Sequence, residues 1–409
     1  MLFLEDTILF FVGAVLVAII SGRFRVSETI GLGVLGLIVA ALRQEEVLFR
    51  GRAHFEVTRE IVLTLFLPPL LFAGALNLRW RMLLRHSPVI LTLSSVGTLG
   101  SVLLIAAASK ALIGWPWEAA LLLGVIVSAT DPMNLHAPFR NRPVPEGLGE
   151  LVGGESLFSS GLSVILSLIL LRGIAQGWET IDASSEILGF LWMGLGGFLV
   201  GASLGALGNR ILGRLHDPLV EVMISLVLAF GSALVAEHLD CSGVIAVIFA
   251  GLLFGNPGKT QRVSPTVLSR LTSNWRLFAF LANAIVFFAL GFQLDLASLV
   301  DHLGAIVAIF FAMIVARALL TYGIAGSDVQ WRRAYPGSWV PVLHWGGLKG
   351  AIPVALSLGI GSVPGLEDHS SSIPAITFGV VLLSLLLQGL TLTPLLSRLG
   401  LSEPRKPQP

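Results

Sequence analysis

Apolar runs of about 17 to 25 residues, the length needed to cross a bilayer as a helix, recur along nearly the whole chain. Of its 409 residues, 55% are hydrophobic and 12% are charged, whereas soluble domains have about 25% charged residues. In lipid, backbone polar groups are satisfied only inside helices or closed barrels, and barrel strands would alternate with a period of two. The sequence therefore predicts an all-α polytopic membrane protein.

Charged and Pro/Gly-rich stretches divide the chain into thirteen candidate transmembrane spans. The first apolar run is preceded by acids and is followed by no small-residue cleavage site, so we interpret it as a spanning helix and not as a signal peptide. The spans cover residues 5–21, 27–42, 60–77, 88–113, 117–136, 148–171, 186–209, 218–237, 242–256, 271–292, 297–325, 338–361 and 373–397.

Basic loop residues indicate how the chain is oriented, because lysine and arginine concentrate in short cytoplasmic loops. Most of them follow odd-numbered spans, and a missed or invented span would reverse this bias from that point on. The exceptions, which follow even-numbered spans, are Arg43, Arg50, Arg52, Arg59, Lys110 and Arg172. The pattern predicts an N-terminus outside and a cytoplasmic C-terminus, with residues 401–409 as a short tail.

Two of the spans are interrupted. The fifth carries Asp131 and Pro132 directly after an apolar run. Proline lacks an amide donor and disfavours helical geometry at the residue before it, so we expect the helix to break at 130–132. The twelfth carries Lys349 among glycines and a proline, and we expect a break at 346–353. Each is the fifth of a set of six, which predicts two inverted six-helix repeats with crossing broken helices and a mid-membrane site.

Asp131 is the central candidate residue. Broken helices expose carbonyl oxygens and helix ends, and a carboxylate among them can hold either a monovalent cation or a proton.

No set of nucleophile, base and orienting group is present, nor a phosphate loop or metal cluster, so we expect neither an enzyme nor a cofactor. The single Cys241 excludes an intrachain disulfide, and a net charge of +1 gives no reason to expect a nucleic-acid partner.

Four serines follow one helical face of the sixth span. Ser156, Ser160, Ser163 and Ser167 have i, i+4, i+7, i+11 spacing. Small residues commonly form close-packing surfaces between membrane helices, and this interpretation is preferred for Ser163 and Ser167. For Ser156 and Ser160, which are nearer Asp131, packing and ion binding are equally good interpretations.

The other charged residues within spans also need partners or an aqueous surface. Glu155 is either a proton carrier or the partner of Arg317, and the ion pair is preferred. Lys349 either holds a fixed positive charge beside helix ends or loses its proton reversibly, and the fixed charge is preferred. Arg276 lies near a helix end, from which it can reach the cytoplasmic surface.

Several motifs resemble the monovalent cation/proton antiporter family, in its bacterial sodium/proton exchanger branch. They are LPPLLFAGALNL at 67–78, ATDP at 129–132, GESLF at 154–158, VARALLTY around Arg317 and WGGLKGA at 345–351.

The resemblance implies a homodimer in the inner membrane of a bacterial cell, with a moving core and a dimerisation domain. The implied division is 1–86 and 173–295 for dimerisation and linker helices, and 87–172 and 296–400 for core helices. It also implies that Asp131 and Ser156 face the ion and that Glu155 pairs with Arg317. We add Thr130, Ser159 and Ser160 as candidate ion ligands.

The chain departs from the pattern of this branch at three places. Ser159-Ser160 replaces the usual Asn-Asp pair, Ala73 replaces an acid of the third span, and Lys349 replaces an arginine. The remaining carboxylate at Asp131 carries one negative charge, which one monovalent cation or one proton neutralises.

The preferred function is secondary active exchange of sodium or potassium for protons by alternating access, with Asp131 as the shared site. The alternative is an antiporter-like protein that carries another, anionic solute or acts as a sensing or binding protein.

Overall fold

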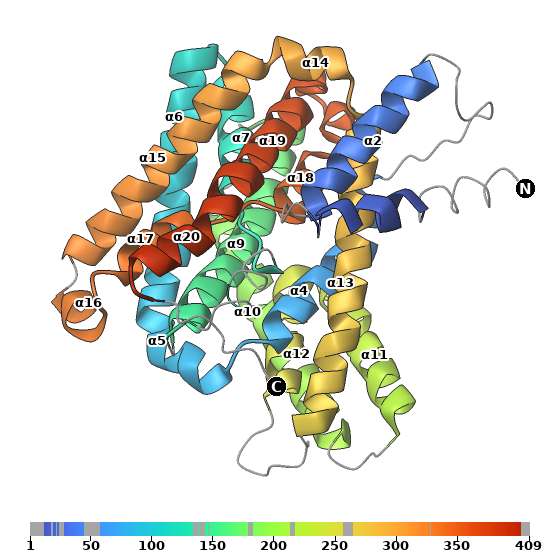
Figure 1. The fold of residues 1–409 in the computed structure, drawn as a ribbon, viewed down its shortest axis with the longest axis vertical. Coiled ribbons are helices and arrows are strands. Elements are labelled where there is room, and N and C mark those ends of the chain that lie inside the picture. Colours follow the sequence, from blue (N-terminus) through green and yellow to red (C-terminus); the bar gives the residue numbers. More distant parts are fainter. Residues whose placement is uncertain are drawn as a thin grey trace, which may run out of the picture.

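The computed structural model describes residues 12–17, 19–21, 23, 28–44, 58–133, 139, 144–145, 147–178, 183–212, 217–256, 265–327 and 329–401. Every regular element in this part of the chain is a helix (Figure 1). This confirms the predicted all-α class.

The helices fall into two sequence halves that correspond in order. The first half contains α2 (Glu28–Gln44), α3 (Arg59–Ile61), α4 (Leu67–Leu76), α5 (Trp80–Thr92), α6 (Thr98–Ile113), α7 (Trp117–Ser128) and α9 (Leu148–Gln176). The helix α10 (Ala183–Leu212) follows. The second half contains α11 (Pro218–His238), α12 (Gly243–Gly255), α13 (Pro265–Gln293), α14 (Leu296–Asp301), α15 (Leu303–Ser327), α16 (Val329–Ala334), α17 (Trp339–Trp345), α18 (Ala351–Ser357), α19 (Ser372–Leu383) and α20 (Leu390–Arg398). Short π-helical segments join α3 to α4 (Val62–Phe66), α5 to α6 (η2, Leu93–Gly97) and α19 to α20 (η6, Ser384–Gly389).

Eight of these helical stretches are long and apolar enough to cross a membrane, among the described residues. Shorter apolar helices cover Val12–Ser21, Glu28–Ala41, Trp117–Ser128, Gly243–Gly255 and Ala351–Ser362. Each of the thirteen predicted spans contains one member of these two sets. The number of membrane crossings itself stays a prediction.

Three boundaries differ from the sequence prediction. The fifth span is helical only to Ser128, and residues 134–136 at its expected end lie outside the described part. The helix of the fourth span begins at Trp80, so Arg81 and Arg85 lie in its first turns and not in a loop. Pro353 lies in the first turn of α18 and not in the break, because the first turn of a helix needs no amide donor there.

The helices pack in two groups. The first consists of α2, α4 and α10 to α13, and the second of α5, α6, α7, α9 and α15 to α20. Figure 1 shows α4, α11, α12 and α13 together at one side and α6, α15, α19 and α20 at the other. Within the first group, α2 and α13 approach so closely that a Cβ on Gly36 or Gly291 would overlap the backbone of the facing helix. Small residues allow this close contact, as is common between membrane helices.

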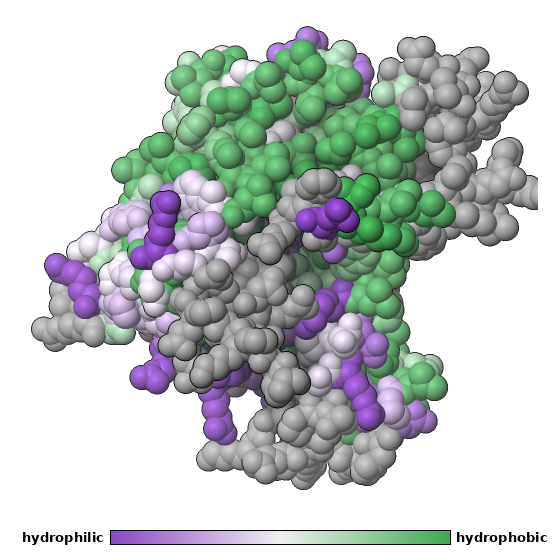
Figure 2. All heavy atoms as spheres, viewed as in Figure 1, coloured by the Kyte–Doolittle hydropathy of each residue, from purple (hydrophilic) through white to green (hydrophobic). Residues whose placement is uncertain are grey.

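The surface is apolar over much of both groups. Figure 2 shows hydrophobic side chains covering the face over α6, α15 and α19. On α10, Leu188 and Leu195 are 68% and 59% exposed. Lipid tails are as apolar as leucine, so such side chains are stable in contact with a bilayer.

Candidate functional site

The two breaks predicted from the sequence lie against each other inside the second helix group. The chain leaves α7 at Ala129, whose ψ is 137°, and has no regular structure through Asp131. The second break covers Gly347 to Gly350, between α17 and α18. The amide of Asp131 donates to the carbonyl of Leu348 at 2.9 Å. Backbone groups that lost their helical partners therefore bond across the two breaks, as buried polar groups must.

A charged side chain sits at a helix end of opposite polarity in each break. The Asp131 carboxylate accepts from the amide of Ala351, the first residue of α18, at 3.2 Å, and from the amide of Met133 at 2.9 Å. The Lys349 ammonium donates to the carbonyl of Ser128, the last residue of α7, at 3.1 Å. Helix N-termini carry partial positive charge and C-termini partial negative charge. Both side chains are at most 2% exposed, so these end charges stabilise them where water does not reach.

Hydroxyl groups from α9 surround the first break. Thr130 Oγ1 and Ser159 Oγ are 2.8 Å apart, and Ser159 also donates to the carbonyl of Ser156 at 3.0 Å. Ser160 Oγ donates to the carbonyls of Thr130 and Ser156. The Ser156 hydroxyl is buried and has no hydrogen-bond partner in the described part of the chain. The structure thus brings the four candidate hydroxyl residues together at Thr130, the residue before Asp131, and all four are buried.

Glu155 and Arg317 form a bidentate ion pair between α9 and α15. The guanidinium donates to the two carboxylate oxygens at 3.1 and 2.8 Å. It also donates to the carbonyls of Leu343 and His344 at the end of α17. Arg317 therefore joins α9, α15 and the helix that leads into the second break.

A narrow cleft reaches this region from between α6 and α15. Its lining includes Thr98, Ser128, Glu155, Arg317 and Lys349. It encloses about 20 Å³, which is room for about one water molecule. Asp131 is not part of this lining, so the cleft reaches the crossing on the side of Lys349.

Two polar residues of the site were missed in the sequence. Ser384 Oγ accepts from the amide of Lys349 at 3.1 Å and donates to Gln388 Oε1 at 2.6 Å. Gln388 Nε2 donates to the carbonyl of Trp345 at 3.3 Å. Both come from the π-helical segment η6, and together they fix the loop of the second break. The available signal was a serine and a glutamine four residues apart in the middle of a mostly apolar span.

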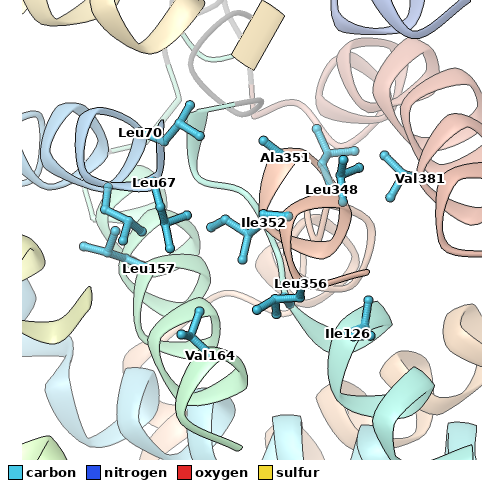
Figure 3. Packing of buried hydrophobic residues seen from close by; sticks show 14 of the residues in the cluster. Leu67, Leu70, Ile126, Leu157, Val164, Leu348, Ala351, Ile352, Leu356 and Val381 are labelled. Carbon is cyan, nitrogen blue, oxygen red and sulfur yellow. The ribbon is translucent and has the colours of Figure 1, made fainter. Parts of the chain in front are cut away.

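The remaining candidates lie farther from the crossing. Ser163 and Ser167 are fully buried on α9, and Ala73 is buried in α4. Arg276 is exposed on α13. Apolar side chains from α4, α9 and α18, such as Leu67, Leu157 and Ile352, fill the space around the second break (Figure 3).

Comparisons with known proteins cover nearly the whole chain. The family described as "Sodium/hydrogen exchanger, transmembrane" matches residues 10–398. The Na(+)/H(+) antiporter NhaH of Halobacillus aidingensis is 33% identical over 396 residues, covering 95% of this chain and 96% of that protein. The Na(+)/H(+) antiporter ApNhaP of Aphanothece halophytica is 36% identical over 349 residues, covering 84% of this chain, which spans 65% of that protein's length.

A solved structure has the same fold. The sodium proton antiporter MjNhaP1 from Methanocaldococcus jannaschii, at pH 8, matches with a TM-score of 0.79. The match covers 98% of this chain and 99% of that one at 19% sequence identity. The predicted antiporter-like fold with its interrupted helices is thereby confirmed.

Proposed function

The chain belongs to the sodium/hydrogen exchanger family, and we propose that it exchanges sodium for protons across a membrane with Asp131 as the shared site. The observation that carries this proposal is the position of the Asp131 carboxylate. It is 1% exposed and accepts from the first amide of α18, and the residue before it, Thr130, contacts the buried hydroxyls of Ser159 and Ser160. Carbonyl and carboxylate oxygens are the ligands that hard cations take in broken-helix sites.

One carboxylate is sufficient for exchange with a stoichiometry of one to one. A sodium ion or a proton neutralises the same single negative charge, so each excludes the other from Asp131. Ser160 occupies the position where relatives of this branch carry an acid, and its hydroxyl contributes no charge. The transport cycle is then electroneutral, and potassium is a second candidate cation because a site with one charge selects less strongly between cations.

Ser156 is the first candidate to complete the cation's shell. Its hydroxyl is buried and has no hydrogen-bond partner among the described residues. A buried hydroxyl without a partner is costly, by about 1–3 kcal/mol. A dehydrated cation would offset this cost by taking the oxygen as a ligand.

Alternating access would move the helix group that contains the crossing against the other group. Contacts inside each group are more extensive than those between them, which supports two bodies. The proposed division is the one expected from the sequence, 1–86 and 173–295 against 87–172 and 296–400. Its boundaries at 86/87 and 172/173 fall inside α5 and α9, so we move them to the loop between α4 and α5 and the loop between α9 and α10, and the third boundary stays at the start of α14. We further propose a homodimer in the inner membrane of a bacterial cell, with the N-terminus outside and the C-terminus in the cytoplasm.

The test is proton movement in proteoliposomes with an imposed pH gradient, on addition of sodium, potassium or lithium. Asp131→Asn is expected to abolish cation-driven dissipation of the gradient, because the amide keeps one acceptor oxygen but loses the charge. Asp295→Asn is the matched control, since Asp295 caps α14 through the amide of Ala297 and asparagine caps helices equally well.

Three outcomes oppose the proposal. Exchange that survives in Asp131→Asn places the shared site elsewhere. A folded wild-type protein that moves no protons with any of the three cations supports the alternative of another solute or a sensing role. A rate that changes with an imposed membrane potential contradicts the electroneutral cycle.

A further inference from the structure

Arg59 is a basic residue on the predicted outer side that the ion site does not use. It is the first residue of α3, directly after Thr58, whose hydroxyl accepts from the amide of Ile61. Basic residues are scarce on this side of the chain. An arginine here therefore needs a reason other than orientation.

The Arg59 side chain turns inward. Its Nη2 donates to Ser167 Oγ of α9 at 3.4 Å, and its Nε is buried without a hydrogen-bond partner in the described part of the chain. A Cβ added to Gly359, just beyond α18, would lie 3.4 Å from the Cβ of Arg59. Arg59 thus stands between α9 and the end of α18, which belong to the group with the crossing, whereas its own helix continues into α4 of the other group.

A line of buried serines on α9 extends from the ion site toward Arg59. Ser156, Ser160, Ser163 and Ser167 lie along one face of α9, and none is more than 1% exposed. The Ser163 hydroxyl, between the ion site and Arg59, has no partner among the described residues. An unpartnered buried hydroxyl on this face is an oxygen that a passing cation or water can use.

We propose that Arg59 closes the outer end of the transport path, as a fixed positive charge that keeps cations off the serine face of α9 until the two helix groups move apart. This inference rests on the proposed function and on the predicted orientation. Among the described residues, one long bond, to Ser167, holds the guanidinium across the boundary between the groups. Such a weak contact breaks readily when the groups move apart, while the charge itself repels a cation at close range in a low-dielectric environment.

The test measures access to the path directly. Ser163→Cys, in a background with Cys241→Ala, is exposed on the outer side of right-side-out vesicles to two membrane-impermeant methanethiosulfonates. One carries a trimethylammonium group and the other a sulfonate. Arg59→Gln is expected to speed modification by the cationic reagent at least tenfold, with a much smaller effect on the anionic reagent. Arg59→Lys is expected to keep the parental rates, because the charge remains.

Arg172→Gln is the matched control, because Arg172 lies near Ser167 on α9 but is exposed, and its ion pair among the described residues is a contact of 3.9 Å to Glu186. The proposal is overturned by unchanged rates in Arg59→Gln, by equal acceleration of both reagents, or by the same effect in Arg172→Gln. If Arg59→Gln does not insert, Ser167→Ala releases the guanidinium and is expected to raise the cationic rate at least threefold, and an unchanged rate there rejects the gate.

Labelling needs no transport, so it separates this inference from the exchange proposal. A charge-selective effect of Arg59 on labelling stands even if Asp131→Asn retains exchange. Labelling rates that do not depend on the charge of Arg59 reject the closure and leave the role of Asp131 intact.

Discussion

The ion pair between Glu155 and Arg317 gives a prediction whose asymmetry can be worked out from its contacts. Glu155→Gln removes the negative charge but leaves Arg317 bonded to the carbonyls of Leu343 and His344. A hydrogen bond to a charged group contributes about 1.5–3 kcal/mol, so we expect this variant to lose about 2–3 kcal/mol.

Arg317→Met removes more. It leaves the Glu155 carboxylate, with a side chain only 3% exposed, without its guanidinium. It also leaves the carbonyls at the end of α17 without their donor. Breaking a buried pair from one side costs about 3–5 kcal/mol, and orphaned carbonyls add to that, so we expect a loss of about 5 kcal/mol.

The double variant closes the cycle. Because the two side chains contact each other, the stability losses of the two single variants should add up to about 2 kcal/mol more than the loss of the double variant. The assay is reversible unfolding in mixed micelles for the wild type, both single variants and the double variant. An Arg317→Met loss no larger than that of Glu155→Gln, or a coupling energy below about 0.5 kcal/mol, would refute the reasoning.

Two further predictions concern the loop of the second break. A Cβ on Gly347 would overlap the Arg317 guanidinium, so Gly347→Ala should destabilise the protein by about 1–3 kcal/mol in the same assay. Gly389→Ala, where an added Cβ meets nothing within 4 Å, should not be destabilised. Gln388→Leu removes the bond to the carbonyl of Trp345, which helps to fix the loop of the second break. It should lower the sodium/proton exchange rate about tenfold in a folded protein, because small displacements of site residues have effects of this order or larger. Thr391→Val removes an exposed hydroxyl that accepts from the Trp345 ring nitrogen and donates to the carbonyls of Leu387 and Gln388. It leaves the Gln388 side chain in place and should exchange near the wild-type rate; equal rates in the two variants would exclude a positioning role for Gln388.

The extent of the breaks shows where local signals succeed and where they stop. Pro132 lacks an amide hydrogen and restricts the backbone of Asp131, so the sequence predicts the end of α7 to within a few residues. Pro353 gives the same local signal, yet it lies inside α18. Proline is tolerated in a first turn, and only the packing of Gly347 to Gly350 against the first break decided where that turn begins.

The sequence by itself determined the class of the protein, its apolar helices, the two interrupted spans and the family, because span length, hydropathy and motif spacing act over short stretches of chain. The tertiary structure decided which groups meet at the interruptions. The Asp131 carboxylate meets an amide 220 positions away, and the Glu155 carboxylate meets a guanidinium 162 positions away. The contacts of Ser384, Gln388 and Arg59 with distant helices likewise come from the tertiary structure alone. Their partners are set by which helices pack together, and no local pattern records the packing of helices far apart in the chain.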